Sequence, residues 1–111
     1  MLLDTRTEQR WANRKVFKTK AVLTMAGAEP NAVRTLDLSG IGISLALPYP
    51  LSIGNTGVIQ FDLMVDGKVK PVKANVSVVH CIFSNDEFRV GYKFMNPDLT
   101  VLSAITKYVG K

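Results

Sequence analysis

Short runs in which apolar and polar residues alternate fill this chain from residue 16 to residue 95, and they limit what it can fold into. A period of two places successive side chains on opposite faces, which is the pattern of a β-strand with one buried face. In one such run, Ile59, Phe61 and Leu63 alternate with less apolar positions. The pattern predicts six strands, at residues 16–25, 32–39, 40–48, 56–67, 68–84 and 87–95.

Turn-forming residues separate the predicted strands. Residues 26–31 combine glycine, proline and asparagine between the first two strands. Asp66 and Gly67 form a strong hairpin signal, because both residue types tolerate a positive φ. Pro71 lacks a backbone N–H, so the run 68–84 must lie at a sheet edge, bulge or break there. Such short connections favour an antiparallel meander or a small barrel.

The last segment changes from a period of two to the spacing of a helix. Asn96 is expected to cap the helix N-terminus, Pro97 to take its first position, and Gly110 to follow its C-terminus. A helix is therefore predicted over about residues 97–109, with an apolar stripe made of Leu99, Leu102, Ile105 and Val109. This stripe would cover one opening of the sheet. The expected fold class is all-β with one C-terminal α-helix.

Size and composition restrict the class of protein. The chain has 111 residues, which is the size of one domain, and 47% of them are hydrophobic, enough for a packed core. We expect no membrane insertion, because no run of about 18 apolar residues occurs, and no secretion, because an apolar signal segment is lacking at the start. Cys81 is the only cysteine, which fits a reducing cytoplasm. These features exclude a disulfide scaffold, a membrane channel and a multidomain enzyme.

Positive charge is concentrated in the first third of the chain. The net charge is +5, and residues 1–34 carry seven basic side chains against three acidic ones. A basic region attracts an anion, such as a nucleotide, a nucleic acid, a lipid head group or an acidic protein. The simpler interpretation is a solubilising surface, and charge alone does not decide between the two.

The residue types needed for catalysis or metal binding do not form a recognised pattern. His80 is the only histidine and is followed by Cys81. Adjacent side chains on a strand point to opposite faces, so these two are poorly placed to share a metal ion. The sequence has no P-loop, no G-x-G-x-x-G and no nucleophile motif. We therefore expect no catalytic residues, no metal site, no cofactor and no enzyme activity.

Two short motifs stand out beside the strands. Arg10 and Arg14 form Arg-x-x-x-Arg ahead of the first predicted strand. Residues 37–42, Asp-Leu-Ser-Gly-Ile-Gly, form Asp-x-Ser-x-x-Gly at the junction of the next two. In this order they match the two signatures of the PilZ domain family, and the chain resembles that family over nearly its whole length. Residues 89–94, RVGYKF, also resemble the family's last core strand before its helix.

The resemblance implies a six-stranded antiparallel β-barrel with a terminal helix, a location in a bacterial cytoplasm and a receptor for cyclic di-GMP. Residues 1–15 are polar and mostly lack periodicity, so they are expected to form a flexible N-terminal arm ahead of the barrel with its helix, residues 16–111. Gln9 lies just before the first arginine, where the residue in this family influences whether one ligand or a stacked pair binds. A neutral residue there leaves the stoichiometry open.

The arginines suit this ligand chemically. Cyclic di-GMP has two anionic phosphates and two guanines. A guanidinium pairs bidentately with phosphate or with the O6/N7 edge of guanine, and it stacks on a purine face. Arg10 and Arg14 on one arm are therefore predicted to clamp phosphate and base together. The alternative is that they are solubilising charges.

The second motif suits the base. Asp37 and Ser39 lie on the same side of an extended segment. The Asp37 carboxylate can accept the N–H groups of guanine's Watson–Crick edge, and the Ser39 hydroxyl can bond the base or a phosphate. Gly40 and Gly42 allow a tight turn and a close approach of the backbone to the ligand. The alternative is that Asp37 and Ser39 only stabilise a turn.

Three functional hypotheses follow. The first is a non-enzymatic cyclic di-GMP adaptor whose ligand changes the surface offered to a protein effector of unknown identity, with motility, biofilm or exopolysaccharide as output. The second is an interaction module of PilZ fold in pilus or motility machinery that binds no nucleotide. The third, single-stranded nucleic-acid binding, requires exposed aromatic residues among basic ones. We expect no nucleic-acid partner, because most strand aromatics are predicted in core positions: Phe17, Phe61, Phe83, Phe88, Tyr92 and Phe94.

Overall fold

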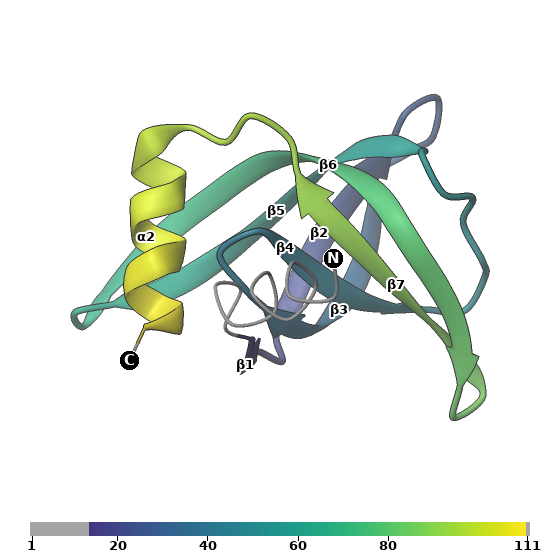
Figure 1. Ribbon diagram of the computed structural model, residues 1–111, viewed down its shortest axis with the longest axis horizontal. Coiled ribbons are helices and arrows are strands. Elements are labelled where there is room, and N and C mark those ends of the chain that lie inside the picture. The colour runs from purple at the N-terminus through teal and green to yellow at the C-terminus, as the bar shows by residue number, and fades with distance from the viewer. Residues whose placement is uncertain (1–13, 111) are drawn as a thin grey trace, which may run out of the picture.

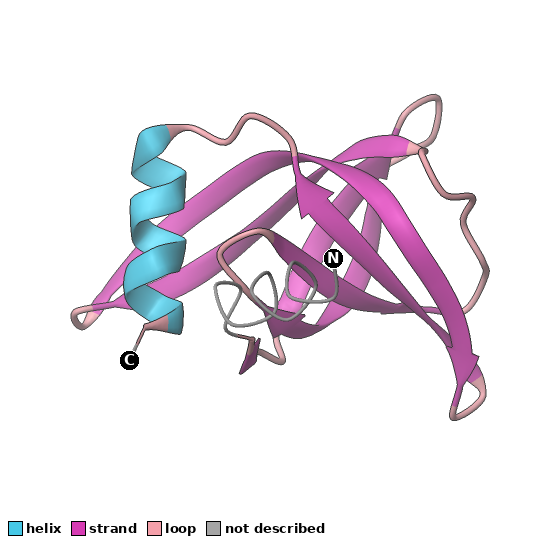
Figure 2. Cartoon of the chain, in the orientation of Figure 1, coloured by secondary structure: helices cyan, strands magenta, loops and turns pink. Residues whose placement is uncertain are grey.

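Antiparallel pairing joins the strands of this chain into a closed barrel, with one helix beside it (Figures 1 and 2). The computed structural model describes residues 14–110. The elements are β1 (Lys15–Val16), β2 (Lys20–Met25), β3 (Asn31–Leu38), β4 (Gly42–Leu47), β5 (Thr56–Val65), β6 (Lys68–Ser84), β7 (Glu87–Phe94) and α2 (Leu99–Val109).

The strand β3 closes the barrel, because it pairs with β2 and also with β4. The order around the ring is β3-β2-β5-β6-β7-β4, so the predicted six-stranded antiparallel barrel is confirmed. The predicted strand 16–25 is interrupted. Val16 faces Asp37 and Lys20 faces Arg34, so residues 17–19 oppose only two residues of β3. This extra residue breaks the ladder and separates β1 from β2.

Alternate residues of each barrel strand point into the core, as the period of two predicts. Ile59, Phe61 and Leu63 are all buried. Burying one such side chain stabilises a fold by about 1.5–3 kcal/mol. Every barrel strand and the helix contribute to the fully buried hydrophobic set, which is Leu23, Leu38, Ile43, Leu45, Leu47, Ile59, Leu63, Val76, Val78, Val90 and Ile105.

The long strand β6 serves two hairpins. Its residues 68–77 pair with β5, and its residues 76–84 pair with β7. Pro71 lies in the first part, where β5 is the only neighbouring strand, so the predicted edge position is confirmed. Asp66 and Gly67 form the predicted hairpin turn, with φ values of 52° and 75°.

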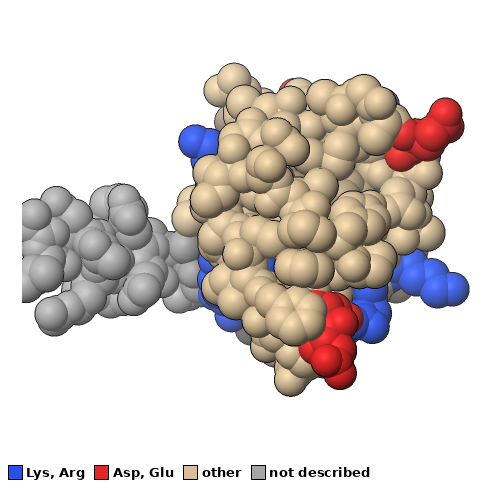
Figure 3. All heavy atoms as spheres, turned by 90° about the vertical axis from the view of Figure 1, so that its right-hand side faces the viewer, with Lys and Arg blue, Asp and Glu red and all other residues tan. Residues whose placement is uncertain are grey.

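The outer end of the β6–β7 hairpin differs from the prediction. Phe83 is 62% exposed, although it was expected in the core. The reason is that β4 pairs with β7 only as far as Phe88, so the hairpin extends beyond the ring. The ring of Phe83 packs on that of Phe88 instead, with centroids 5.0 Å apart. Figure 3 views this side of the molecule, and most of the side chains it shows are uncharged.

The helix α2 begins two residues later than predicted. Asn96 adopts a left-handed φ of 46° and is not the cap, and Asp98 takes the N-cap position without a side-chain hydrogen bond. Ile105 is buried, but Leu99 is 82% exposed. Six residues turn a helix by about 600°, which places Leu99 about 120° from Ile105 around the axis. The packed face keeps Ile105 and Val109 of the predicted stripe, but Val101, Ala104 and Tyr108 take the place of Leu99 and Leu102.

The described residues contain no helix of the length and hydropathy that a membrane span requires.

Thr35 fastens the irregular segment between β1 and β2 to the barrel. Its hydroxyl is fully buried and donates to the Phe17 carbonyl at 2.5 Å. The same oxygen accepts the Thr19 N–H at 2.8 Å. The backbone adds a bond from the Thr35 N–H to the Thr19 carbonyl at 2.9 Å. One side chain thus replaces the ladder bonds that the break in pairing removes.

Thr35→Val should lower the free energy of unfolding by about 2–3 kcal/mol, because the isosteric methyl leaves a part-buried N–H and a buried carbonyl without their partner. Urea denaturation followed by circular dichroism measures this. Thr24→Val is the matched control, since Thr24 is a half-buried strand threonine whose hydroxyl has no hydrogen bond within residues 14–110. Equal stabilities of the two variants would contradict the role given to Thr35.

Candidate functional site

Asp37 lies at the centre of the candidate site, between two arginines. One carboxylate oxygen accepts from Arg14 Nη1 at 2.8 Å, and the other accepts from Arg89 Nη2 at 2.5 Å. The Asp37 side chain is only 11% exposed, whereas the two guanidinium side chains are about half exposed. Charge-assisted bonds of this kind are stronger than neutral ones. The carboxylate therefore holds two cations at the surface of the barrel.

Strand register brings these residues together. Asp37 pairs with Ser44, which pairs with Gly91, and in the neighbouring row Arg34 pairs with Ala46, which pairs with Arg89. Directly paired residues point to the same face of a sheet, and these rows face outward because the rows beside them are in the core. The strand β4 between Asp37 and Arg89 presents only small side chains on this face. The Arg89 side chain can therefore cross β4 and reach Asp37.

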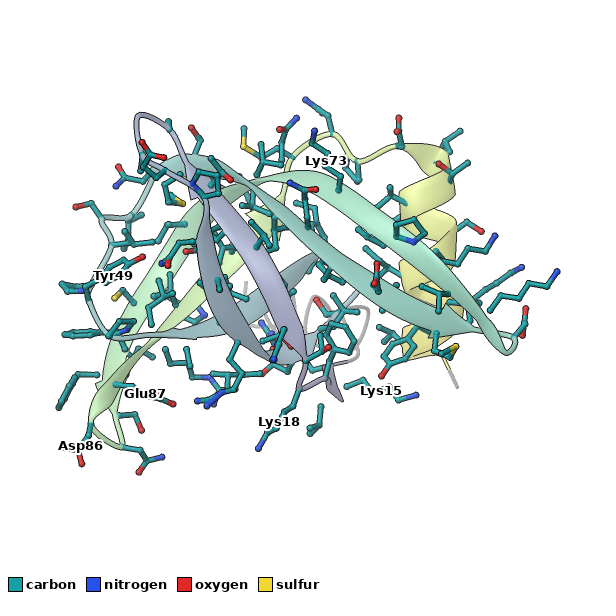
Figure 4. All side chains as sticks on the ribbon, turned by 180° about the vertical axis from the view of Figure 1, so that it is seen from behind. Lys15, Lys18, Tyr49, Lys73, Asp86 and Glu87 are labelled. Carbon is teal, nitrogen blue, oxygen red and sulfur yellow. The ribbon has the colours of Figure 1, made fainter. Side chains whose placement is uncertain are left out.

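A cavity of about 540 Å³ adjoins Asp37. Its lining residues are Val16, Lys18, Arg34, Leu36, Asp37, Ser84, Asn85, Glu87 and Arg89. Arg34 forms a second ion pair there, with both oxygens of Glu87 at 3.2 Å. Lys18 and Glu87 both lie along the lower part of the barrel in Figure 4. With Arg14 included, the site contains four cationic side chains and two carboxylates, so it favours an anion.

The turn that follows Asp37 uses the Ser39 side chain internally. Ser39 is fully buried, and its hydroxyl oxygen accepts the N–H groups of Ile41 at 3.2 Å and of Gly42 at 3.1 Å. The backbone N–H of Ser39 donates to the Gly42 carbonyl at 2.9 Å. The structure thus gives Ser39 the role of a turn former. A bond from Ser39 to a ligand stays a prediction.

The two glycines of this motif differ in what surrounds them. A Cβ atom on Gly42 would lie 2.1 Å from the Tyr92 carbonyl oxygen, whereas a Cβ on Gly40 would meet nothing within 4 Å. Neither has a positive φ. Gly42 is therefore required by the close approach of β4 to β7, within the barrel itself. The predicted approach of these glycines to a ligand is not tested by this geometry.

The segment that carries Arg14 also contacts the helix. The next residue, Lys15, donates from Nζ to the Tyr108 carbonyl at 3.2 Å and lies 4.5 Å from the centre of the Tyr108 ring. Phe17 packs on the same ring, with centroids 5.4 Å apart. Neighbouring residues thus contact the Asp37 carboxylate and the last turn of α2. Gln9 and Arg10, both predicted site residues, lie outside the described residues.

The structure adds residues that sequence reasoning did not assign to the site. Arg34, Glu87 and Arg89 fall only within predicted strands in the sequence analysis. Their relevance depends on the pairing of β7 with β4 and of β4 with β3, which no local spacing indicates. Within residues 14–110, no group of three or more His, Cys, Asp or Glu side chains is arranged to hold a metal ion.

Tyr92 lies in the core on β7 and does not contribute charge to the site. It is 2% exposed, and its hydroxyl has no hydrogen-bond partner among the described residues. Burial raises the pKa of Tyr92 above its ordinary value, and nearby Tyr49 and Cys81 act in the same direction. The phenol therefore stays neutral at physiological pH, and the arginines, lysine and carboxylates set the charge of the site.

Comparison with known proteins identifies the architecture. The sequence matches the family model described as PilZ domain over residues 4–111. No match was found among curated proteins.

Solved structures give the same fold. The PilZ domain of YcgR from Escherichia coli, a structure with c-di-GMP, matches with a TM-score of 0.66, 14% identity and coverage of 92% of this chain and 89% of that chain. The PilZ domain of CeSA, from a cellulose-synthesizing bacterium, gives 0.62 with 18% identity over 87% and 94% of the two chains.

MotI/DgrA, an inhibitor of motility from Bacillus subtilis, gives a TM-score of 0.81 with 11% identity. This match covers 91% of the present chain but only 49% of MotI/DgrA, so the chain spans about half the length of that protein. At these low identities, the solved structures establish the fold alone.

Gly42→Ala should destabilise the ligand-free protein by about 1–3 kcal/mol or more, because β4 and β7 must separate to admit the methyl group. Gly40→Ala, two residues away in the same motif, should leave stability within about 0.5 kcal/mol. Thermal and urea unfolding of the two variants measure the difference. Similar losses in both would show that the contact with Tyr92 does not determine the need for glycine.

Proposed function

This chain belongs to the PilZ domain family, and from that premise we propose that it is a non-enzymatic receptor for cyclic di-GMP. One observation carries the proposal. Arg14 of the Arg-x-x-x-Arg motif and Asp37 of the Asp-x-Ser-x-x-Gly motif are 23 residues apart, and they form an ion pair of 2.8 Å. The two motifs therefore meet at one place, beside a cavity that a nucleotide base can enter.

The site has the donors and acceptors that this ligand requires. Cyclic di-GMP presents two phosphates, which favour guanidinium partners, and two guanines, whose edges carry both donors and acceptors. The excess of cationic side chains around Asp37 and its cavity supports binding of a dianion. The carboxylates provide acceptors for guanine N–H groups. GMP shares the base but not the cyclic backbone, so it should bind much more weakly.

In the proposed mechanism, ligand binding brings Arg10 and the rest of the N-terminal arm onto the barrel wall, where Arg14 and Lys15 already lie. Arg10 joins Arg14 on the ligand, with Gln9 beside them. Ordering a segment on binding costs about 2–5 kcal/mol, and each charge-assisted hydrogen bond contributes about 1.5–3 kcal/mol. Several such bonds must therefore form together. Closure of the arm would change the surface next to α2, because the arm ends at Lys15, which contacts Tyr108 of that helix.

We propose that a protein effector reads this change. The solved structures with the same fold come from a motility inhibitor, a cellulose-synthesizing bacterium and YcgR, which supports motility or exopolysaccharide, and with it biofilm formation, as the output. The action is expected in the cytoplasm, as the single cysteine suggests. The competing function is an interaction module of the same fold that binds no nucleotide.

Isothermal titration with cyclic di-GMP tests the proposal and reports affinity and stoichiometry together. Arg10→Ala and Arg14→Ala should each weaken binding about tenfold to a hundredfold, because each removes at least one charge-assisted bond. The melting temperature of the ligand-free Arg14→Ala protein should barely move, since Asp37 keeps Arg89 as its partner.

Lys73→Ala is the matched control, because Lys73 is an exposed cation on a different part of the barrel from Lys18 (Figure 4). It should bind as the wild type does. Cyclic di-GMP should also raise the melting temperature of the wild type, whereas GMP and cyclic AMP should not. Absence of any binding by the wild type would favour the interaction module instead. Unchanged affinity in both arginine variants would refute the clamp.

A further inference from the structure

We propose that Arg89 is a ligand-binding residue that reads the O6/N7 edge of a guanine, and that Asp37 holds its guanidinium ready for this contact. The inference rests on the proposed function, since it concerns the same ligand. It adds a binding residue from β7, which lies outside both sequence motifs. It also divides the site into a part that takes the base and a part that takes phosphate.

Arg89 lines the cavity and is already held in place. It projects from a strand paired on both sides, with Ala46 of β4 and Ile82 of β6 as its neighbours. Asp37 binds one of its terminal nitrogens at 2.5 Å, and within residues 14–110 no other acceptor engages the guanidinium. Its remaining N–H groups are therefore available, and its side chain is 47% exposed. A donor held in this way loses little conformational entropy when a ligand arrives.

The cavity wall around Arg89 has little net charge but many hydrogen-bonding groups. Arg89 is paired with Asp37, and Arg34 is paired with Glu87 through both carboxylate oxygens. Ser84 and Asn85 add neutral polar groups to the lining. Guanine is likewise neutral, with acceptors at O6 and N7 and donors at N1 and N2. A wall of alternating guanidinium and carboxylate groups complements that base better than it complements a phosphate.

The unbalanced positive charge lies elsewhere in the site. Lys18 lines the cavity and has no carboxylate partner among the described residues. Arg14 shares the Asp37 carboxylate with Arg89, so the three groups together keep a positive charge. Arg14 is also on the segment that leads to Arg10. The phosphates should therefore be bound on the side of Arg14 and Lys18, and the base on the side of Arg89.

The choice of arginine matters for this contact. A guanidinium presents two parallel N–H groups that match O6 and N7 of guanine, whereas an ammonium offers a point charge. Lysine at position 89 would keep the ion pair with Asp37 but lose the bidentate contact. Arg89→Lys therefore removes the proposed contact with the base while it keeps the ion pair with Asp37.

The test is isothermal titration of the whole chain with cyclic di-GMP over a series of salt concentrations. Arg89→Ala and Arg89→Lys should each weaken binding about tenfold to a hundredfold. In Arg89→Lys, which keeps the charge, the dependence of affinity on salt should stay that of the wild type, because the lost contact is with a neutral base. Arg14→Ala should weaken binding and also reduce the salt dependence, because its lost partner is an anion. Melting temperatures of the ligand-free variants are measured in parallel.

Lys93→Ala is the matched control, because Lys93 is an exposed cation on the same strand whose side chain has no partner within residues 14–110. It should bind as the wild type does. Wild-type affinity in Arg89→Lys would overturn the inference and reduce Arg89 to a support for Asp37. A loss of salt dependence in Arg89→Lys equal to that in Arg14→Ala would overturn the assignment to the base. Absence of binding by the wild type would instead refute the proposed function, so the two failures are distinguishable.

Discussion

The pairing of β3 with β4 is the interaction on which the barrel and the candidate site both depend. It closes the ring, and it places Asp37 two strands from Arg89 with only small side chains between them on the outer face. The register shift after Thr35 is part of the same pairing. Without the shift, Asp37 would exchange faces with Leu38, because one residue of slip reverses every side chain of a strand. A bulge of one residue therefore decides that a carboxylate, and not a leucine, faces the arginines.

Much of the fold could be predicted from the sequence, because its signals are local. Alternation identified the strands, Asp66–Gly67 identified a hairpin, and Pro71 identified an edge. The predicted start of the helix was wrong. Asn96 is a residue type that often caps a helix, but here it adopts the left-handed conformation of a turn residue. The predicted burial of Phe83 was wrong, because its exposure depends on where a different strand, β4, ends. Local patterns carry no information on the length of a neighbouring strand.

The same limit explains which parts of the site could be found. Arg14 and Asp37 belong to recognisable motifs, and the structure brings them together. Arg89 could not be found in this way, since its contact with Asp37 crosses 52 residues of sequence and a whole strand. Ser39 and Gly42 illustrate the reverse case. Their motif suggests ligand contacts. The turn, however, already accounts for the Ser39 hydroxyl, and the close approach of β4 to β7 already accounts for the absence of a side chain at Gly42. A signature can therefore be shared between folding and binding.

The position of Arg14 gives the site a physical connection to the helix. Arg14 contacts Asp37, the following Lys15 contacts Tyr108, and Phe17 packs on the same ring. These contacts lie within four consecutive residues, which the Thr35 hydroxyl anchors at their far end. Because this segment is short and is anchored at Phe17, a movement of Arg14 toward a ligand would also move Lys15 relative to Tyr108. Because a ligand can shift an equilibrium only through contacts that differ between two states, this segment is where the proposed binding at Asp37 would be coupled to the packing of α2.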